Sequence, residues 1–164
     1  MCLQEVGKPL QLREVEIPKP LPHQVLIRVH TCGVCRTDLH ILEGDLKPPH
    51  LPLILGHQIV GTIEALGSDV DQVEVNQRVG VPWLGSTCGV CPYCLAGQEN
   101  LCDHPLFTGF TLNGGFAEYC VADARFIFPL PSGYDDLSLA PLLCAGLIGY
   151  RAFRLAGKGQ VLGL

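Results

Sequence analysis

The chain has 164 residues, of which 48% are hydrophobic and 16% are charged. This composition is typical of a folded domain with a sizeable core and excludes a disordered chain. The net charge of −5 offers no basic surface for nucleic acid, and we find no signal peptide or membrane span in the sequence. We therefore expect a cytoplasmic protein without nucleic-acid or membrane partners, whose nine cysteines are metal ligands or free thiols.

Short strands separated by glycine and proline turns are predicted in the first two-thirds of the sequence. β-Branched and apolar segments predict strands at residues 24–30, 58–66, 77–81 and 115–121. Glycine and proline, of which the chain has 19 and 13, are concentrated between these segments. The pattern predicts a mainly β domain with some helix over residues 1–134, built as a small barrel or a sandwich.

Four cysteines lie close together between the last two predicted strands. Their spacing is C-x2-C-x2-C-x7-C, and they are Cys88, Cys91, Cys94 and Cys102. A closed structural zinc site is a tetrahedron of thiolate or imidazole ligands, and short C-x2-C steps let one turn supply several thiolates. The spacing predicts a structural zinc lobe over residues 84–104. Two disulfides, or free thiols without a metal, are the alternatives.

Residues 135–164 differ in character from the β-rich part. Asp135 and Asp136 precede an apolar run, and acidic residues are favoured at the positive end of a helix dipole. We expect one long helix that ends at Gly157, followed by the beginning of a buried strand at residues 161–164. Cys144 is expected in the first turns of this helix.

Three further candidate ligands, Cys35, His57 and Cys144, are far apart in the sequence, so their spacing alone identifies no site. His57 follows Gly56, whose missing side chain lets the backbone approach its neighbours closely. Cys32 and Cys35 also form a C-x-x-C pair, which leaves a redox site as an alternative.

A zinc deaminase also uses histidine and cysteine ligands, in an H-x-E and P-C-x-x-C arrangement. Here Val90 precedes Cys91, and Ile59 takes the position of the glutamate. The sequence therefore disfavours a deaminase.

The motifs taken together resemble the N-terminal half of zinc-dependent alcohol dehydrogenases of the medium-chain dehydrogenase/reductase superfamily. Besides the four-cysteine run, the resemblance is carried by residues 33–40, 56–57, 97–102, 113–119 and 143–146. It implies a GroES-like, partly open β-barrel catalytic domain with a zinc lobe. It also implies that residues 135–164 are a linking helix and the first strand of a Rossmann domain that the chain does not complete.

The resemblance implies two zinc ions per chain. The four-cysteine run matches the structural site, and Cys35, His57 and Cys144 match the catalytic ligands, a Cys2His set known from alcohol dehydrogenase that leaves a fourth position open. A zinc ion in this site lowers the pKa of an alcohol that binds at the open position. The alcohol then becomes an aldehyde or ketone by hydride transfer to NAD or NADP.

Three residues of the 33–40 motif match groups that handle the proton and the cofactor. Thr37 and His40 match the hydroxyl and the imidazole of a proton relay, and Thr37 also contacts substrate. Arg36 and His40 match cofactor-binding residues.

Asp38 matches a carboxylate that orients the imidazole of His57, and Trp83 matches an aromatic wall of the substrate pocket that favours small alcohols. Gln58 departs from the family, which often has glutamate after the ligand histidine. The neutral amide removes a negative charge near the metal, so we expect a slightly lower pKa for the bound alcohol.

The glycine-rich G-x-G-x-x-G turn that follows the first strand of a dinucleotide-binding domain does not occur in the sequence. We therefore expect this chain to be inactive without a cofactor domain, and the full-length enzyme to be a homo-oligomer. A non-catalytic zinc-binding β module is the alternative function.

Overall fold

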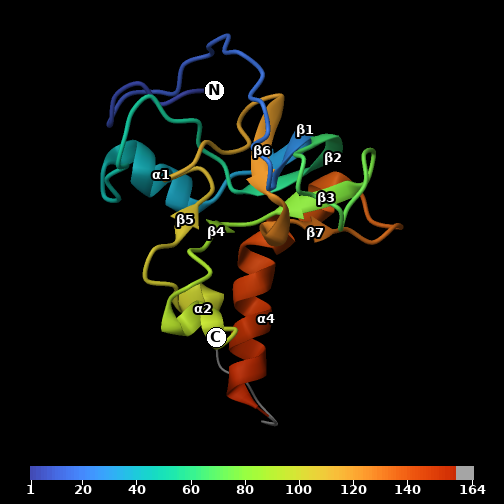
Figure 1. Ribbon diagram of the computed structural model, residues 1–164. Coiled ribbons are helices and arrows are strands. Elements are labelled where there is room, and N and C mark those ends of the chain that lie inside the picture. The colour runs from blue at the N-terminus through green and yellow to red at the C-terminus, as the bar shows by residue number, and fades with distance from the viewer. Residues whose placement is uncertain (158–164) are drawn as a thin grey trace.

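A computed structural model describes residues 1–157 of the protein. A five-stranded antiparallel sheet forms its body (Figure 1). The order of its strands is β6-β1-β2-β3-β7, so β6 and β7 form the two edges. The strands are β1 (Gln24–Gly33), β2 (Gln58–Leu66), β3 (Arg78–Val81), β6 (Tyr119–Asp123) and β7 (Phe128–Pro129). A second sheet pairs β4 (Leu84–Ser86) with β5 (Leu106–Phe107). The prediction of a mainly β domain is confirmed, whereas the strand predicted at 161–164 lies outside the described residues.

The main hydrophobic core lies on one face of the five-stranded sheet. Because successive residues of a strand point to opposite faces, alternate apolar residues of β1, β2 and β3 reach this core. Its fully buried members are Val25, Ile27, Ile59, Ile63, Val79 and Val81. The opposite face carries a second, smaller cluster formed with helical residues that follow β7.

Helical segments surround the sheets and connect them. They are α1 (Arg36–Glu43), α2 (Pro92–Leu95), η1 (Glu99–Leu101), η2 (Ala124–Phe126), α3 (Asp136–Leu139), η3 (Ala140–Leu143) and α4 (Ala145–Ala156). Within residues 1–157 no single helix is long and apolar enough to cross a membrane; one pair, Asp136–Leu143 and Ala145–Ala156, reaches that length together but is bent by 53°.

The single long helix expected after Asp135 is wrong. The structure has α3, the 3-10 helix η3 and then α4, with Cys144 at the break in a non-helical conformation (φ −132°, ψ −80°). Pro141 has no N–H with which to continue an α-helical ladder, and the Cys144 N–H donates to the Pro141 carbonyl at 3.3 Å. Cys144 therefore begins α4 and does not lie within a helix. The predicted end at Gly157 is confirmed, because α4 ends at Ala156.

The strand expected at 115–121 is only partly correct, because β6 begins at Tyr119. The amides of Gly115 and Phe116 donate to the carbonyls of Gly56 and Leu55, at 2.9 and 3.0 Å. Gly115 and Phe116 therefore pack on the loop before β2, and contact with β1 begins at Glu118, whose carbonyl accepts from the Val29 amide at 2.8 Å.

Asp123, at the end of β6, connects this edge strand to the base of the predicted zinc lobe. It is 2% exposed and accepts hydrogen bonds from Arg125 Nε and Nη2 at 3.0 and 2.6 Å and from Ser86 Oγ at 2.9 Å. Burial raises the pKa of this carboxyl, but the hydrogen bonds from Arg125 and Ser86 outweigh burial and hold the pKa below its ordinary value.

We expect Asp123→Asn to lower the free energy of unfolding by about 2 kcal/mol at neutral pH, since the Arg125 side chain loses its buried partner. A carboxyl with a lowered pKa stabilises the fold above its unfolded pKa of about 3.9 and loses this effect as the pH falls through its folded pKa. The difference between the two proteins should therefore shrink below about pH 4. Urea unfolding at a series of pH values measures this difference.

Asp71→Asn is the control, because Asp71 is exposed in a turn and its loss should change the stability by less than about 0.5 kcal/mol. An equal destabilisation by Asp123→Asn at pH 3 and pH 7 would contradict the assignment.

Candidate metal centres and substrate pocket

Cys35 lies where β1 passes into α1. Its backbone is extended, and it is the N-cap residue of the helix. Its amide donates to Asp38 Oδ2 at 2.8 Å, so a carboxylate in the first turn fixes the backbone of the cysteine. The Cys35 thiol lies 3.6 Å from Thr37 Oγ1. The beginning of α1 thus presents a thiol and a hydroxyl on the same side of the helix.

His57 lies in the loop before β2 and is 1% exposed. Its position depends on Gly56, which has a positive φ of 96° and on which a Cβ would lie only 2.6 Å from Phe116 Cδ1. The Gly56 amide donates to Asp38 Oδ1 at 3.0 Å. One buried carboxylate, Asp38, therefore fixes the backbones of two candidate ligands, Cys35 and His57.

Cys144 completes a cluster with these two residues. Its Sγ lies 3.7 Å from that of Cys35, and the candidate ligand atoms of Cys35, His57 and Cys144 all lie within 4.8 Å of one another. The structure thus brings together three residues, the first and last of which are more than 100 positions apart in the sequence. Their role as zinc ligands stays a prediction.

The chemistry of this cluster fits a zinc ion. Two sulfur atoms and one imidazole nitrogen are donors that zinc prefers. His57 Nδ1 lies 3.6 Å from Asp38 Oδ1 and is the buried side-chain nitrogen without a hydrogen-bond partner in the described part of the chain. With Nδ1 directed at a carboxylate, Nε2 remains as the nitrogen available to a metal.

The two thiols of the cluster share their negative charge unequally. Burial raises the pKa of Cys35, but hydrogen bonds from the backbone and hydroxyl of Thr37 and contacts with His57 and Cys144 outweigh it and lower this pKa to about 7. Burial and the neighbouring Cys35 raise the pKa of Cys144 to about 11. Burial lowers the pKa of His57, but Asp38 and Cys35 raise it more. A metal that binds both thiolates therefore displaces a proton from Cys144.

A cavity of about 970 Å³ opens beside the cluster and is lined by Thr37, His57, Trp83 and Cys144 as well as by residues of the cysteine lobe and α4. The ring centroid of Trp83 lies 4.9 Å from that of His57, edge to face, and 4.9 and 5.8 Å from those of Phe107 and Phe110, which stack on it. The sequence analysis assigned no role to these two phenylalanines. Their closeness in the sequence to the cysteine run was the available signal.

The remaining predicted site residues occupy α1. Thr37 and His40 are three positions apart and therefore lie on neighbouring positions of one helical face. Thr37 lines the cavity, whereas His40 Nδ1 lies 3.0 Å from Asp45 Oδ2 with 41% of its side chain exposed. Arg36 is exposed. The structure thus places Thr37 at the cavity and His40 nearer to solvent.

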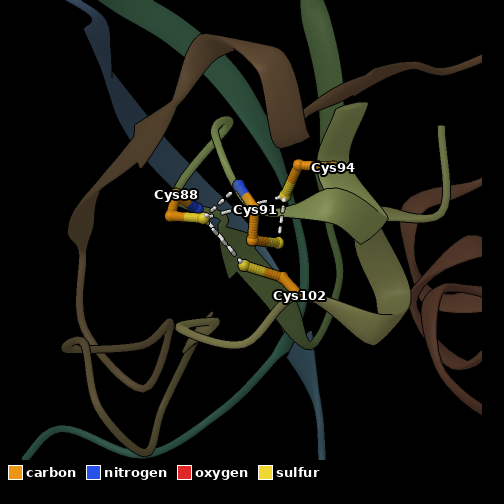
Figure 2. Close-up of side chains that lie close together, drawn as sticks. All are labelled: Cys88, Cys91, Cys94 and Cys102. Carbon is orange, nitrogen blue, oxygen red and sulfur yellow. Dashed lines mark hydrogen bonds between the residues drawn. The ribbon is translucent and has the colours of Figure 1, made fainter. Parts of the chain in front are cut away.

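The four-cysteine lobe forms a second cluster (Figure 2). All four ligand atoms lie within 4.8 Å of one another, and neighbouring sulfur atoms are 3.5 Å apart in the pairs Cys91–Cys94 and Cys88–Cys102. These separations exceed a disulfide bond of about 2.05 Å, and all nine cysteines are free thiols. The structure therefore contains no disulfide among these four cysteines.

Backbone amides point at the sulfur atoms of the lobe. The amides of Cys91 and Cys88 donate to Cys88 Sγ and Cys102 Sγ, both at 3.4 Å. Backbone hydrogen bonds from Asp103 and Cys94 are the main reason why the pKa of Cys91 falls to about 6. Amide donors stabilise thiolates, so the lobe fits a metal that needs four of them.

Comparison with known proteins agrees with this geometry. Residues 21–132 match the family model of the alcohol dehydrogenase GroES-like domain. An alcohol dehydrogenase from Geobacillus stearothermophilus is 46% identical over 154 residues, which cover 93% of this chain and 45% of the relative. The chain thus spans less than half the length of the curated relatives that it matches.

Solved structures of related dehydrogenases superpose on the fold. Galactitol-1-phosphate dehydrogenase from Escherichia coli has a TM-score of 0.85 at 31% identity, covering 94% of this chain and 44% of that protein. Acetophenone reductase from Geotrichum candidum, in complex with NAD, has a TM-score of 0.81 at 32% identity, covering 92% and 45%. The chain is a member of the alcohol dehydrogenase GroES-like domain family.

Proposed function

We propose that this chain is the catalytic domain of a zinc-dependent alcohol dehydrogenase that oxidises small alcohols to aldehydes or ketones. The observation that carries the proposal is the convergence of Cys35, His57 and Cys144, whose ligand atoms lie within 4.8 Å of one another, beside a cavity that His57 and Cys144 line. A Cys2His set supplies three of the four ligands of a tetrahedral zinc and leaves one position for substrate.

In this proposal each residue around the cluster has a distinct task. When bound, zinc lowers the pKa of an alcohol, and NAD or NADP accepts the hydride. Asp38 holds the imidazole of His57 in the orientation that directs Nε2 at the metal. Thr37 Oγ1 would accept the alcohol proton while it gives up its own hydroxyl proton, which would leave toward the partly exposed His40 and solvent. Trp83 limits the size of the alcohol.

The four cysteines of the lobe hold the second zinc, which has no open position and does no chemistry. Exposed Arg36, together with His40, would bind the phosphates and ribose of the cofactor. We assign residues 1–134 to the catalytic domain and residues 135–164 to the connection with a Rossmann domain, and we expect the complete enzyme to be a homo-oligomer. Thiolate ligands need a reducing compartment, which supports a cytoplasmic location.

A fusion of residues 1–157 to the C-terminal part of the Geobacillus relative tests this function. We expect alcohol-dependent reduction of NAD by the fusion, and a loss of kcat of at least about 1,000-fold in His57→Ala, since the open metal site loses a ligand and the alcohol is no longer activated. Spectrophotometric assay of NADH formation from a series of primary alcohols measures both.

His23→Ala is the matched control, because His23 lies before β1 and outside both clusters, and its activity should equal that of the unsubstituted fusion. A folded fusion that holds two zinc ions and binds NAD but oxidises no alcohol contradicts the proposal and favours the non-catalytic zinc module.

A further inference from the structure

Asp136 has no place in the proposed chemistry, yet His30 and Arg78, from two strands of the sheet, both contact it. Thr62, from the strand between them, contacts His30. We propose that Asp136, with His30 (β1), Thr62 (β2) and Arg78 (β3), forms a clasp that positions Cys144 for metal binding. The inference rests on the proposed role of Cys144 as a metal ligand. The four residues of this clasp are positioning residues, because none of them belongs to the Cys35–His57–Cys144 cluster.

Arg78 directs its donors at the segment that leads to Cys144. Its Nε donates to Asp136 Oδ1 at 2.7 Å, its Nη1 to the Pro131 carbonyl at 3.2 Å and its Nη2 to the Tyr134 carbonyl at 2.8 Å. A guanidinium is planar and presents its donors in a fixed fork. Arg78 therefore fixes both the carboxylate and the backbone that carries it.

His30 holds the other oxygen of the same carboxylate. Its Nδ1 lies 2.9 Å from Asp136 Oδ2, and its Nε2 lies 3.0 Å from Thr62 Oγ1. Because an ionised carboxylate only accepts, Nδ1 is the donor, and in the neutral ring Nε2 accepts from the Thr62 hydroxyl. The side chains of Arg78, Asp136 and His30 are 26%, 28% and 31% exposed, so the clasp is partly shielded from solvent.

The clasp and an apolar contact hold opposite ends of one short segment. Asp136 begins α3, and Leu143, the residue before Cys144, is buried with Leu139 and Ala140 against Val60 of β2. On β3, a Cβ at Gly80 would lie 2.7 Å from Leu143 Cδ2. Any larger residue at position 80 would push the Leu143 side chain aside. Gly80 lies on the same face of the sheet as Thr62 and Arg78.

This arrangement fixes the third ligand from outside the metal cluster. Cys144 follows the segment directly, so a rotation or slide of α3 and η3 on the sheet moves its Sγ relative to that of Cys35. Cys35 and His57 are held separately by Asp38. Without the clasp, Cys35 and His57 keep their places, and the segment before Cys144 is held by the apolar cluster that includes Leu143.

Zinc affinity measured by competition with a chromophoric chelator tests the proposal on this chain. The site that Cys144→Ser abolishes serves as the reporter, and the four-cysteine site serves as an internal reference. We expect Arg78→Gln and Asp136→Asn each to weaken the reporter site about 10- to 100-fold, the usual effect of losing a group that orients a ligand. The four-cysteine site should keep its affinity, which separates positioning from general destabilisation.

Arg28→Gln is the matched control. It breaks the exposed Arg28–Glu64 ion pair, 3.8 Å long, on the same face of β1 and β2. Arg28 is the cross-strand neighbour of Thr62, but its ion pair is with Glu64 and not with Asp136, so the variant removes a charge beside the clasp without breaking the clasp's own contacts. Both zinc affinities should be unchanged. Arg78→Lys keeps the charge without the fork, so we expect an intermediate affinity, and this milder variant serves if Arg78→Gln does not fold.

The double variant should be little worse than either single one, because both substitutions break the same contacts. Unchanged affinity of the reporter site in Asp136→Asn and Arg78→Lys overturns the clasp. Absence of any Cys144-dependent zinc in the unsubstituted chain overturns the proposed catalytic metal instead, so the two failures are distinct.

Discussion

Cys144→Ser is expected to lower the zinc content of the purified chain from about two ions to about one. A serine hydroxyl is a poor replacement for a thiolate ligand, and only Cys35 and His57 would remain at the site. Structural zinc sites with four protein ligands bind with about 10–16 kcal/mol, so loss of one of three ligands should weaken binding by about 100-fold or more. Metal analysis after gel filtration measures the stoichiometry directly.

Cys32→Ser is the matched control for this experiment. Cys32 forms the C-x-x-C pair with Cys35 but belongs to neither cluster. Burial raises the pKa of Cys32 to about 12, and its thiol donates to the Gly33 carbonyl at 3.7 Å. We expect two zinc ions in Cys32→Ser. Two ions in Cys144→Ser would show that the second metal does not depend on Cys144. One ion in both the variant and the unsubstituted chain would show that the three-residue cluster holds no metal.

Whether the ligands of a cluster are close together or far apart in the sequence explains which cluster could be predicted from spacing. The cysteine lobe is local: its four ligands fall within fifteen residues, so spacing alone predicted the cluster that the structure contains. Cys35, His57 and Cys144 belong to three segments whose approach depends on tertiary packing. Their juxtaposition was predicted from the family resemblance, because spacing carries no information over such distances.

The helical region shows where sequence patterns were insufficient. The apolar periodicity after Asp135 continues through Cys144 and predicted one helix. Periodicity does not distinguish the 3-10 helix that contains Pro141 from the α-helices before and after it. The sequence analysis gave His30 no role. The alternation of β1 places it opposite the core-facing Val25 and Ile27, but only the fold brings Asp136 to that face.

Removal of zinc from the four-cysteine lobe is expected to unfold the lobe and leave the sheet intact. Within residues 88–102, only Cys91 and Cys102 are buried, whereas Val90 and Leu95 are each 76% exposed. A segment without an apolar core cannot offset the entropy of ordering its backbone, so its structure depends on the metal. Chelation should therefore speed amide hydrogen exchange in residues 88–102 by about 100-fold or more. Mass spectrometry of peptic fragments measures this.

Two comparisons make the result specific to the lobe. The strands β1 and β2 carry the fully buried Ile27, Ile59 and Ile63, so their exchange should stay slow after chelation. Cys91→Ser should unprotect the lobe even in the presence of zinc, whereas zinc-loaded Cys144→Ser should leave it protected, because that substitution affects only the other cluster. Protection of residues 88–102 that survives chelation would mean that packing against the rest of the chain holds the lobe. In that case the four cysteines would not be its structural basis.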